Sequence, residues 1–181
     1  MTSTDNTIPN GLIVWGVIIS DINLLPELEK LLYHNFGEVI IRSPIIPFDF
    51  TDYYEKEMGK NLKRCWIVTK NIVGLDRLVE IKKYAEQIEK KFLAPDNKRR
   101  INLDPGVLTL QNFVLTTHKN YGHRIYLKDG VYAEVTLIYR HNSYQALEWT
   151  YPDYRKAIDF FNESRKKLRQ FLSQTQDDLL S

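Results

Sequence analysis

Residues 47–54 place two carboxylates, Asp49 and Asp52, three positions apart among four aromatic side chains. Carboxylates in such a partly desolvated setting either ligate a hard cation such as Mg²⁺ or have raised pKa values. Asp49 is therefore a candidate for both metal binding and catalysis, and Asp52 a candidate metal ligand. A second interpretation is that Thr51 or Asp52 caps a short helix over residues 53–58. The sequence leaves both interpretations open.

A second polar cluster follows Arg100. Strand alternation puts Asn102 and Asp104 side by side on one face of a predicted strand over residues 99–104. Asp104 is a candidate catalytic carboxylate and a third candidate Mg²⁺ ligand, Asn102 is a candidate ligand-binding amide, and Arg100 could meet an anion. Asp104 also begins an Asp-Pro-Gly run, which is common in turns, so a purely turn-bracing role stays open.

A third cluster lies on a predicted hairpin, in which residues 123–127 and 131–139 are joined by a three-residue loop ending in Gly130. This register sets Arg124 opposite Glu134 and Tyr126 opposite Tyr132. An exposed Arg124–Glu134 pair is a simple cross-strand ion pair. On a covered face it would instead aim a guanidinium fork at a phosphate or carboxylate, with Glu134 as a catalytic carboxylate.

Two further residues are candidates for ligand binding. His123, at the start of the hairpin, is either a structural histidine or a general base. Tyr151 belongs to an aromatic run around Pro152 that leads into the last helix. Such runs anchor a helix against the core, and tyrosine hydroxyls also line ligand clefts.

The composition of the chain excludes several classes of protein. The chain has 181 residues, of which 43% are hydrophobic and 27% charged, which excludes disordered and collagen-like chains. The longest apolar run near the start, residues 12–19, is too short for a bilayer, and no signal peptide precedes it. We therefore expect a cytoplasmic protein that does not cross a membrane. The net charge of +2 gives little reason to expect nucleic-acid binding.

Other signatures are absent from the sequence. It contains no P-loop, no dinucleotide fingerprint, no serine nucleophile elbow and no paired cysteines for zinc. The single cysteine, Cys65, lies in an apolar strand-like run, which favours a buried thiol over a reactive one.

The elements that must position these clusters follow the order β-α-β-β-α-β, typical of a ferredoxin-like split unit in an α+β fold. Two helices would cover one face of a four-stranded antiparallel sheet, with an added antiparallel hairpin, a further strand or helical turn near residues 107–117, and a C-terminal amphipathic helix. We predict a single domain over residues 11–172, with flexible tails at 1–10 and 173–181. The core elements are expected at residues 12–19, 23–36, 39–46, 62–69, 76–93 and 99–104, and the last helix at 154–172.

Several of these segments together resemble one uncharacterised bacterial family, catalogued as domain of unknown function 4416. The resemblance runs from about residue 12 to residue 172. It implies a small cytoplasmic prokaryotic protein and supplies no established activity. The segments that carry it are residues 47–59, 102–106, 123–127, 132–137 and 149–154.

The leading interpretation is a domain that binds a phosphorylated or nucleotide-like small molecule in a carboxylate, arginine and tyrosine cleft, either as a binding protein or as an enzyme. Arginines would meet the anion, carboxylates would hold Mg²⁺ or move a proton, and tyrosines would pack the apolar part. The alternative is a non-catalytic interaction module in which the aromatic and ion-pair clusters are structural. The sequence does not determine the oligomeric state.

Overall fold

The computed structural model describes residues 8–180, and the side chains of residues 8–174. Most of the N-terminal tail predicted at residues 1–10 lies outside the described residues. Short 3₁₀ turns at Ile22–Leu24 and Leu75–Arg77 precede α1 and α3. The elements are β1 (Asn10–Ile19), α1 (Leu25–Phe36), β2 (Val39–Arg42), β3 (Ile46–Pro47), α2 (Glu55–Met58), β4 (Lys63–Gly74), α3 (Leu78–Lys91), β5 (Ile101–Leu108), β6 (Asn112–Thr117), β7 (Ile125–Lys128), β8 (Val131–Arg140), β9 (Ser143–Ala146), α4 (Pro152–Lys156) and α5 (Ile158–Leu180).

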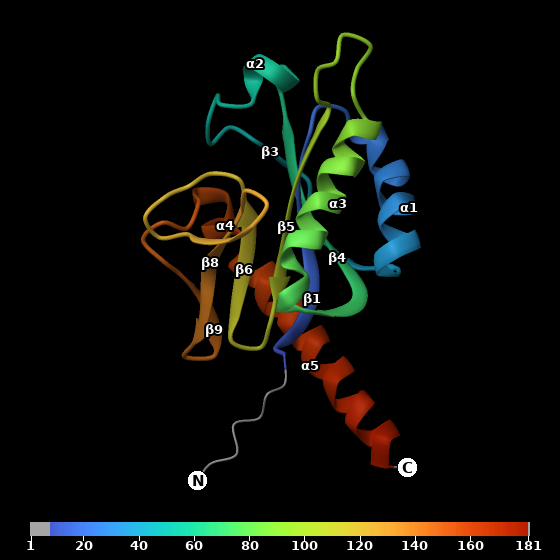
Figure 1. Ribbon diagram of the computed structural model, residues 1–181, viewed down its shortest axis with the longest axis vertical. Coiled ribbons are helices and arrows are strands. Elements are labelled where there is room, and N and C mark those ends of the chain that lie inside the picture. The colour runs from blue at the N-terminus through green and yellow to red at the C-terminus, as the bar shows by residue number, and fades with distance from the viewer. Residues whose placement is uncertain (1–7, 181) are drawn as a thin grey trace.

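A single antiparallel sheet of nine strands runs through the described part of the molecule, so the α+β class is confirmed (Figure 1). The strand order is β2-β4-β1-β5-β6-β8-β7, with β3 paired to β4 and β9 paired to β8. We expected four core strands and an added hairpin. Instead β6 pairs with both β5 and β8 and joins the two into one sheet. This pairing satisfies an edge of β5 that would otherwise be left open.

Helices cover both faces of the sheet. Ile13 and Trp15 of β1 pack toward α1 and α3, whereas Leu12 and Val14 pack toward α5. Figure 1 shows α1 and α3 side by side against the strands β1, β4 and β5. A strand that is buried on both faces carries apolar residues at every position rather than at alternate ones. The continuous apolar run at residues 12–19 follows from this arrangement.

The β5 strand continues through Asp104, Pro105 and Gly106, so the turn interpretation of this segment is wrong. A Cβ on Gly106 would lie 2.5 Å from the ring of Phe113, which explains the glycine. Proline has no N–H for a ladder bond, and the Pro105 carbonyl accepts from the Thr116 hydroxyl at 2.6 Å. The β5–β6 ladder therefore begins only at Gly106, opposite Leu115. Before that point the two strands separate.

The predicted last helix is two helices. A short α4 ends at Lys156, and α5 runs from Ile158 to Leu180, past the end we predicted at residue 172. Residues 173–180 contain no glycine or proline that would stop a helix. No helix among the described residues has both the length and the apolar composition needed to span a bilayer.

The predicted hairpin forms between β7 and β8. Tyr126 lies opposite Tyr132, as predicted, but the loop is not the three-residue one we expected. Lys128 pairs with Val131, so the turn consists of Asp129 and Gly130, with positive φ of 53° and 76°, and a register shift lies between Tyr126 and Lys128. The rings of Tyr126 and Tyr132 meet edge to face at a centroid distance of 5.3 Å. The loop that precedes this hairpin returns the chain to the place where β5 and β6 separate.

Candidate functional site

A cavity of about 440 Å³ opens where β5 and β6 separate. Four parts of the chain enclose it: the ends of β5 and β6, one face of α3, the loop at residues 48–54, and the start of α4. Arg64 of β4 also faces it. The lining residues used below are Phe48, Phe50, Tyr53, Tyr54, Arg64, Lys82, Glu86, Glu89, Arg99, Asn102, Asp104, His118, Lys119, Tyr121, Tyr151, Asp153 and Tyr154.

Arg64, Asp153 and Tyr154 form what we call the buried end of the cavity. The Arg64 side chain is 2% exposed, and its Nε lies 3.0 Å from Oδ2 of Asp153. Its guanidinium carbon lies 4.6 Å from the centre of the Trp66 ring and 5.0 Å from that of Tyr154. Nη1 of Arg64 has no hydrogen-bond partner among the described residues, and the Tyr154 hydroxyl interacts with the Arg64 guanidinium. Buried polar atoms without partners are rare, so this end is equipped to receive an acceptor.

Strand alternation places Arg64 at the buried end. In β4, Cys65 and Ile67 point toward α1 and α3, while Trp66 and Val68 point toward α5. Arg64 shares the face of the second pair. The Cys65 thiol is buried, as predicted, and burial raises its pKa to about 11.

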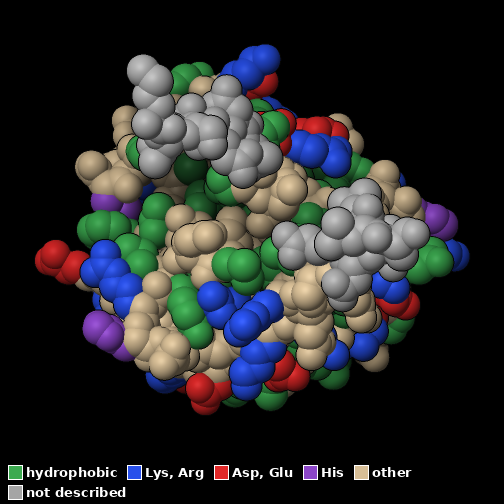
Figure 2. All heavy atoms as spheres, turned by 90° about the horizontal axis from the view of Figure 1, so that it is seen from below, with side chains coloured by type: hydrophobic (Ala, Val, Ile, Leu, Met, Phe, Trp, Pro, Cys, Tyr) green, Lys and Arg blue, Asp and Glu red, His purple; other side chains and the backbone are tan. Residues whose placement is uncertain are grey.

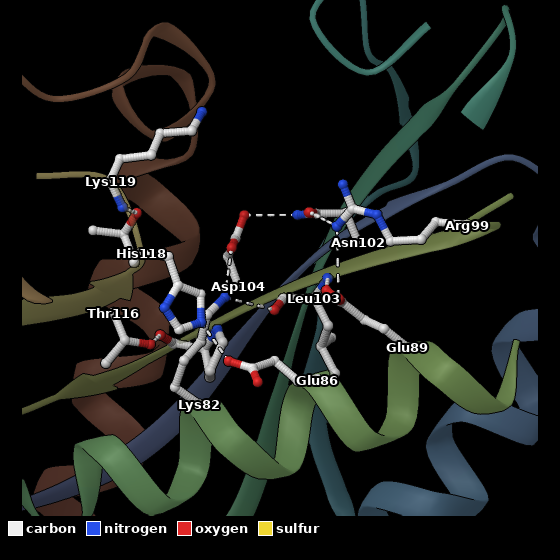
Figure 3. Close-up of polar contacts among 12 residues, drawn as sticks. Lys82, Glu86, Glu89, Arg99, Asn102, Leu103, Asp104, Thr116, His118 and Lys119 are labelled. Carbon is white, nitrogen blue, oxygen red and sulfur yellow. Dashed lines mark hydrogen bonds and ion pairs between the residues drawn. The ribbon is translucent and has the colours of Figure 1, made fainter. Parts of the chain in front are cut away.

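Asp104 and Asn102 form the β5 wall, and their predicted side-by-side placement is seen directly in Figure 3. Oδ2 of Asp104 accepts from Asn102 at 2.8 Å, and Oδ1 lies 3.1 Å from Nζ of Lys82. Asn102 in turn accepts from Nη1 of Arg99 at 3.0 Å. Burial acts to raise the pKa of Asp104, but the charges of Lys82 and Arg64 outweigh it and hold the pKa below the ordinary value.

One stripe of α3 supplies Lys82, Glu86 and Glu89, spaced four and three residues apart (Figure 3). Glu89 accepts from the Leu103 amide at 2.6 Å, and burial raises the pKa of Glu89. Glu86 contacts Nε2 of His118, whose Nδ1 lies 2.8 Å from the Gly130 carbonyl. These contacts tie α3 to β5 and to the β7–β8 turn, so the charged side of the cavity is rigidly framed.

Phe48, Phe50, Tyr53 and Tyr54, from the loop at residues 48–54, form the aromatic wall of the cavity. Two ammonium groups from the opposite side hold this loop. Nζ of Lys119 lies 4.0 Å from the centre of the Tyr53 ring, and Nζ of Lys156 lies 4.7 Å from that of Phe50. Cation–π contacts of this kind link a loop to its neighbours without a salt bridge.

The carboxylates predicted in this loop lie elsewhere. Asp49 and Asp52 are exposed and do not line the cavity. The Thr51 hydroxyl accepts from the Tyr53 amide at 3.1 Å in the turn before α2, but the N-cap of α2 is Tyr54 and no side chain caps it, so neither Thr51 nor Asp52 has the capping role considered for it. Among the described residues no group of three or more His, Cys, Asp or Glu side chains is arranged to hold a metal ion.

Arg124 and Glu134 are buried together, with side chains 2% and 0% exposed. Nε of Arg124 donates to Oε2 of Glu134 at 2.8 Å, and Nε2 of His123 lies 3.0 Å from the same oxygen. The face is therefore covered, but the guanidinium meets protein groups: Nη1 donates to the Lys119 carbonyl at 2.9 Å and Nη2 to the Tyr151 hydroxyl at 3.0 Å.

The structure thus brings together part of the predicted site. Three predicted residues line the cavity, and three others form a layer directly behind it. Arg100 instead lies 3.4 Å from Asp21, and Tyr126 is 57% exposed on the hairpin. The lining residues are Asn102, Asp104 and Tyr151, those behind are His123, Arg124 and Glu134, and those apart are Asp49, Asp52, Arg100 and Tyr126.

Charged residues of the cavity that sequence reasoning missed include Arg64, Lys82, Glu86, Glu89 and Asp153. Lys82 carried a readable signal, because it occupies a buried position in the apolar stripe of α3, four residues after Leu78 and three before Ala85. Arg64 carried a weaker one as a charge at the start of an apolar strand. Asp153 had none, because the first turn of any helix favours an acidic residue.

The match to a family model covers the residues just described. Residues 9–168 match the family described as Domain of unknown function (DUF4416). The chain belongs to this family. The resemblance expected from the sequence is thereby confirmed, and the matched span includes every residue of the buried end and of the aromatic wall. No curated protein and no solved structure matches the chain.

Proposed function

We propose that the protein binds a small phosphorylated molecule of nucleotide-like size in this cavity. The single observation that carries the proposal is the buried guanidinium of Arg64, which faces the cavity with Nη1 unpartnered. The volume of about 440 Å³ lies within the range of small-molecule sites.

The buried end suits an anion. A guanidinium presents a planar fork of donors that matches the oxygens of phosphate or carboxylate, and such bonds strengthen where water is excluded. The Tyr154 hydroxyl lies beside it and interacts with the same guanidinium. Lys82 adds a positive charge on the neighbouring wall, although Asp104 lies 3.1 Å from it.

The aromatic wall suits the other end of the ligand. Phe48 contacts Phe50 and Tyr54 at centroid distances of 5.8 Å, so several ring faces gather on one side of the cavity. A planar ring, such as a nucleobase, can stack on such faces. This arrangement supports a phosphorylated molecule with an aromatic part over a small inorganic anion.

Binding has more support than proton transfer. A general acid or base works best with a pKa near the working pH. The pKa of Asp104 instead lies below its ordinary value, because the charges of Lys82 and Arg64 outweigh the effect of burial. Mg²⁺ is proposed only as a companion of the ligand, because it is commonly held by one or two carboxylates together with substrate phosphates. Of the carboxylates that line the cavity, we assign that role to Asp104.

The strand order β2-β4-β1-β5, with α1 and α3 on one face, also supports a ferredoxin-like split unit as the frame of the buried end.

The distribution of charge on the surface supports a small ligand over nucleic acid as the binding partner. On the face in Figure 2, Lys and Arg side chains lie beside Asp and Glu side chains rather than forming one continuous basic surface. Nucleic-acid binding proteins usually present a basic patch or stripe.

The test is a thermal-shift screen of nucleoside mono-, di- and triphosphates against the matching nucleosides, with and without Mg²⁺. We expect phosphorylated probes to raise the Tm, nucleosides to leave it unchanged, and Arg64→Lys to weaken the best probe at least about tenfold. Arg42→Lys is the matched control, because Arg42 pairs with Glu29 on the exposed surface. If no phosphorylated probe raises the Tm, or if Arg64→Lys binds like the wild type, the interaction-module alternative gains.

A further inference from the structure

The geometry points to Arg124 as a positioning residue for the ligand cavity, which acts by holding Tyr151 as a hydrogen-bond donor to the bound anion. This inference rests on the proposed function and deepens it. It changes the role expected of Arg124 from the sequence, where the guanidinium itself was to meet the ligand.

The partners of Arg124 carry the inference. Apart from its anchor Glu134, each group that the side chain contacts belongs to a residue that lines the cavity. Nη1 donates to the Lys119 carbonyl, Nη2 donates to the Tyr151 hydroxyl, and the guanidinium carbon lies 4.6 Å from the centre of the Tyr121 ring. One buried charge therefore sets the positions of three wall residues that come from two separate loops.

The direction of the bond to Tyr151 decides what that hydroxyl can do. Guanidinium N–H groups only donate, so the Tyr151 oxygen accepts. Its own hydrogen is then left to donate, and none of the described residues accepts it. Because Tyr151 lines the cavity and is 38% exposed, that hydrogen is available to an acceptor on a ligand.

The anchor keeps this geometry fixed. Glu134 is fully buried, and its two oxygens receive Arg124 at 2.8 Å and the Thr136 hydroxyl at 3.0 Å. His123 lies 3.0 Å from the oxygen shared with Arg124. A buried ion pair in which each of the three guanidinium nitrogens makes a hydrogen bond cannot reorient at low cost. Arg124 is thus held in place to present Tyr151 rather than free to reach the ligand itself.

The site then offers the ligand donors from two directions, Arg64 from β4 and Tyr151 from the start of α4. Tyr54 also lines the cavity, and burial raises the pKa of its hydroxyl. A phosphate ester has several oxygens and can accept from both sides at once. A ligand without acceptors on both sides would leave one donor unpaired, which lowers its affinity.

The test is a double-mutant cycle with inorganic phosphate and phenyl phosphate as probes. Affinity is measured by calorimetry, and the Tyr151 ring by NMR of ring-labelled tyrosine. Tyr151→Phe removes only the hydroxyl, and Arg124→Gln combined with Glu134→Gln removes the positioning pair without leaving a lone buried charge. Tyr126→Phe, which lies outside the cavity, is the matched control.

We expect Tyr151→Phe to weaken phosphate about tenfold to a hundredfold. The Arg124/Glu134 variant should lower the affinity for phosphate by a similar factor and shift the Tyr151 resonance before any probe is added. In the Tyr151→Phe background, the same two substitutions should cause no further loss of affinity. A purely structural pair would lower the Tm without changing the affinity, and that result overturns the inference.

Two other outcomes separate this inference from the proposed function. Normal phosphate affinity in Tyr151→Phe, with affinity lost in Arg64→Lys, overturns the positioning role and leaves the proposed function standing. If the wild type binds neither probe and its Tyr151 resonance does not move, both fail.

Discussion

Nε of Arg64, on β4, lies 3.0 Å from Oδ2 of Asp153, on α4. This pair joins the first half of the sheet to the segment that leads into the last helix. Both side chains are buried, and the rings of Trp66 and Tyr154 cover the guanidinium. The buried end of the cavity therefore exists only when residues almost ninety positions apart have packed together, and its integrity can be tested through stability.

Asp153→Asn should destabilise the protein by about 3–5 kcal/mol, because it leaves the Arg64 charge buried with its carboxylate partner removed. Urea unfolding of the variant and wild type measures the difference. Asp96→Asn is the control, since Asp96 and Lys98 form an ion pair with side chains 55% and 61% exposed. It should change stability by less than about 1 kcal/mol. Equal effects of the two substitutions would contradict the assignment of Arg64 and Asp153 as a buried pair.

Gly16→Ala should both destabilise the protein and disturb ligand binding. The new methyl group would lie 2.8 Å from the Tyr154 hydroxyl, 3.1 Å from Nη2 of Arg64 and 3.1 Å from the Asp104 carbonyl. Overpacking of this kind costs about 1–3 kcal/mol. Thermal unfolding checks it, with Gly122→Ala as control because nothing lies within 4 Å of a Cβ there. A Gly16→Ala variant as stable as Gly122→Ala would show that the buried end has room to adapt.

Asp104→Asn should change how stability depends on pH. The pKa of Asp104 in the folded protein lies below its ordinary value of 3.8, because Lys82 and Arg64 outweigh the effect of burial. The carboxylate therefore contributes stability that is fully present above 3.8 and is lost as the pH falls through the lower, folded-state pKa. We expect the wild type to have a larger free energy of unfolding than Asp104→Asn near neutral pH, and the difference between the two proteins to become smaller in acid.

Unfolding free energies measured by urea from neutral pH down to below 3.8 test this expectation. Glu89 acts with the opposite sign, because burial raises its pKa and the charge of Asp104 raises it further, so Asp104→Asn also reduces this opposing contribution. A gap that stays constant across this range would contradict the ionised, paired state of Asp104.

Cys65 should be inert in the folded protein. Its thiol is buried, and burial raises its pKa to about 11. Since the thiolate is the reacting form, labelling by a thiol reagent at mildly alkaline pH should be at least about a hundredfold slower in the native protein than in urea. Comparable rates under both conditions would show that β4 opens readily and would weaken the description of the buried end as well packed.

The local patterns predicted much of the fold, for physical reasons that show in single elements. Residues 12–19 are apolar at every position because β1 is covered on both faces. The pairing of Tyr126 with Tyr132 followed from matching faces, since a slip of one residue would have inverted every side chain. The segment Asp104-Pro105-Gly106 was harder, because its turn-like composition serves a strand whose edge is open on one side.

In the candidate site, too, local rules placed some residues correctly, and residues that depend on distant contacts were not placed. Asn102 and Asp104 could be placed together because strand alternation is a local rule, and they do form a hydrogen bond. The partners of Arg124 depend on how two loops approach each other, so the sequence could not distinguish a guanidinium aimed at a ligand from one that holds Tyr151. Asp49 and Asp52 had the right chemistry for a metal but lie on the exposed side of their loop.

The amino-acid pattern alone determined the mixed α+β class, the order β1, α1, β2, β4, α3, β5 of the core elements, the pairing of Tyr126 with Tyr132 and family membership. These depend on backbone preferences and on the periodicity of burial, which act over a few residues. Only the tertiary structure decided that Arg64, Lys82 and Asp153 share one cavity with Asp104 and Tyr151. Convergence of distant side chains depends on how the sheet separates between β5 and β6 and how α4 packs beside it, and no short-range rule carries that information.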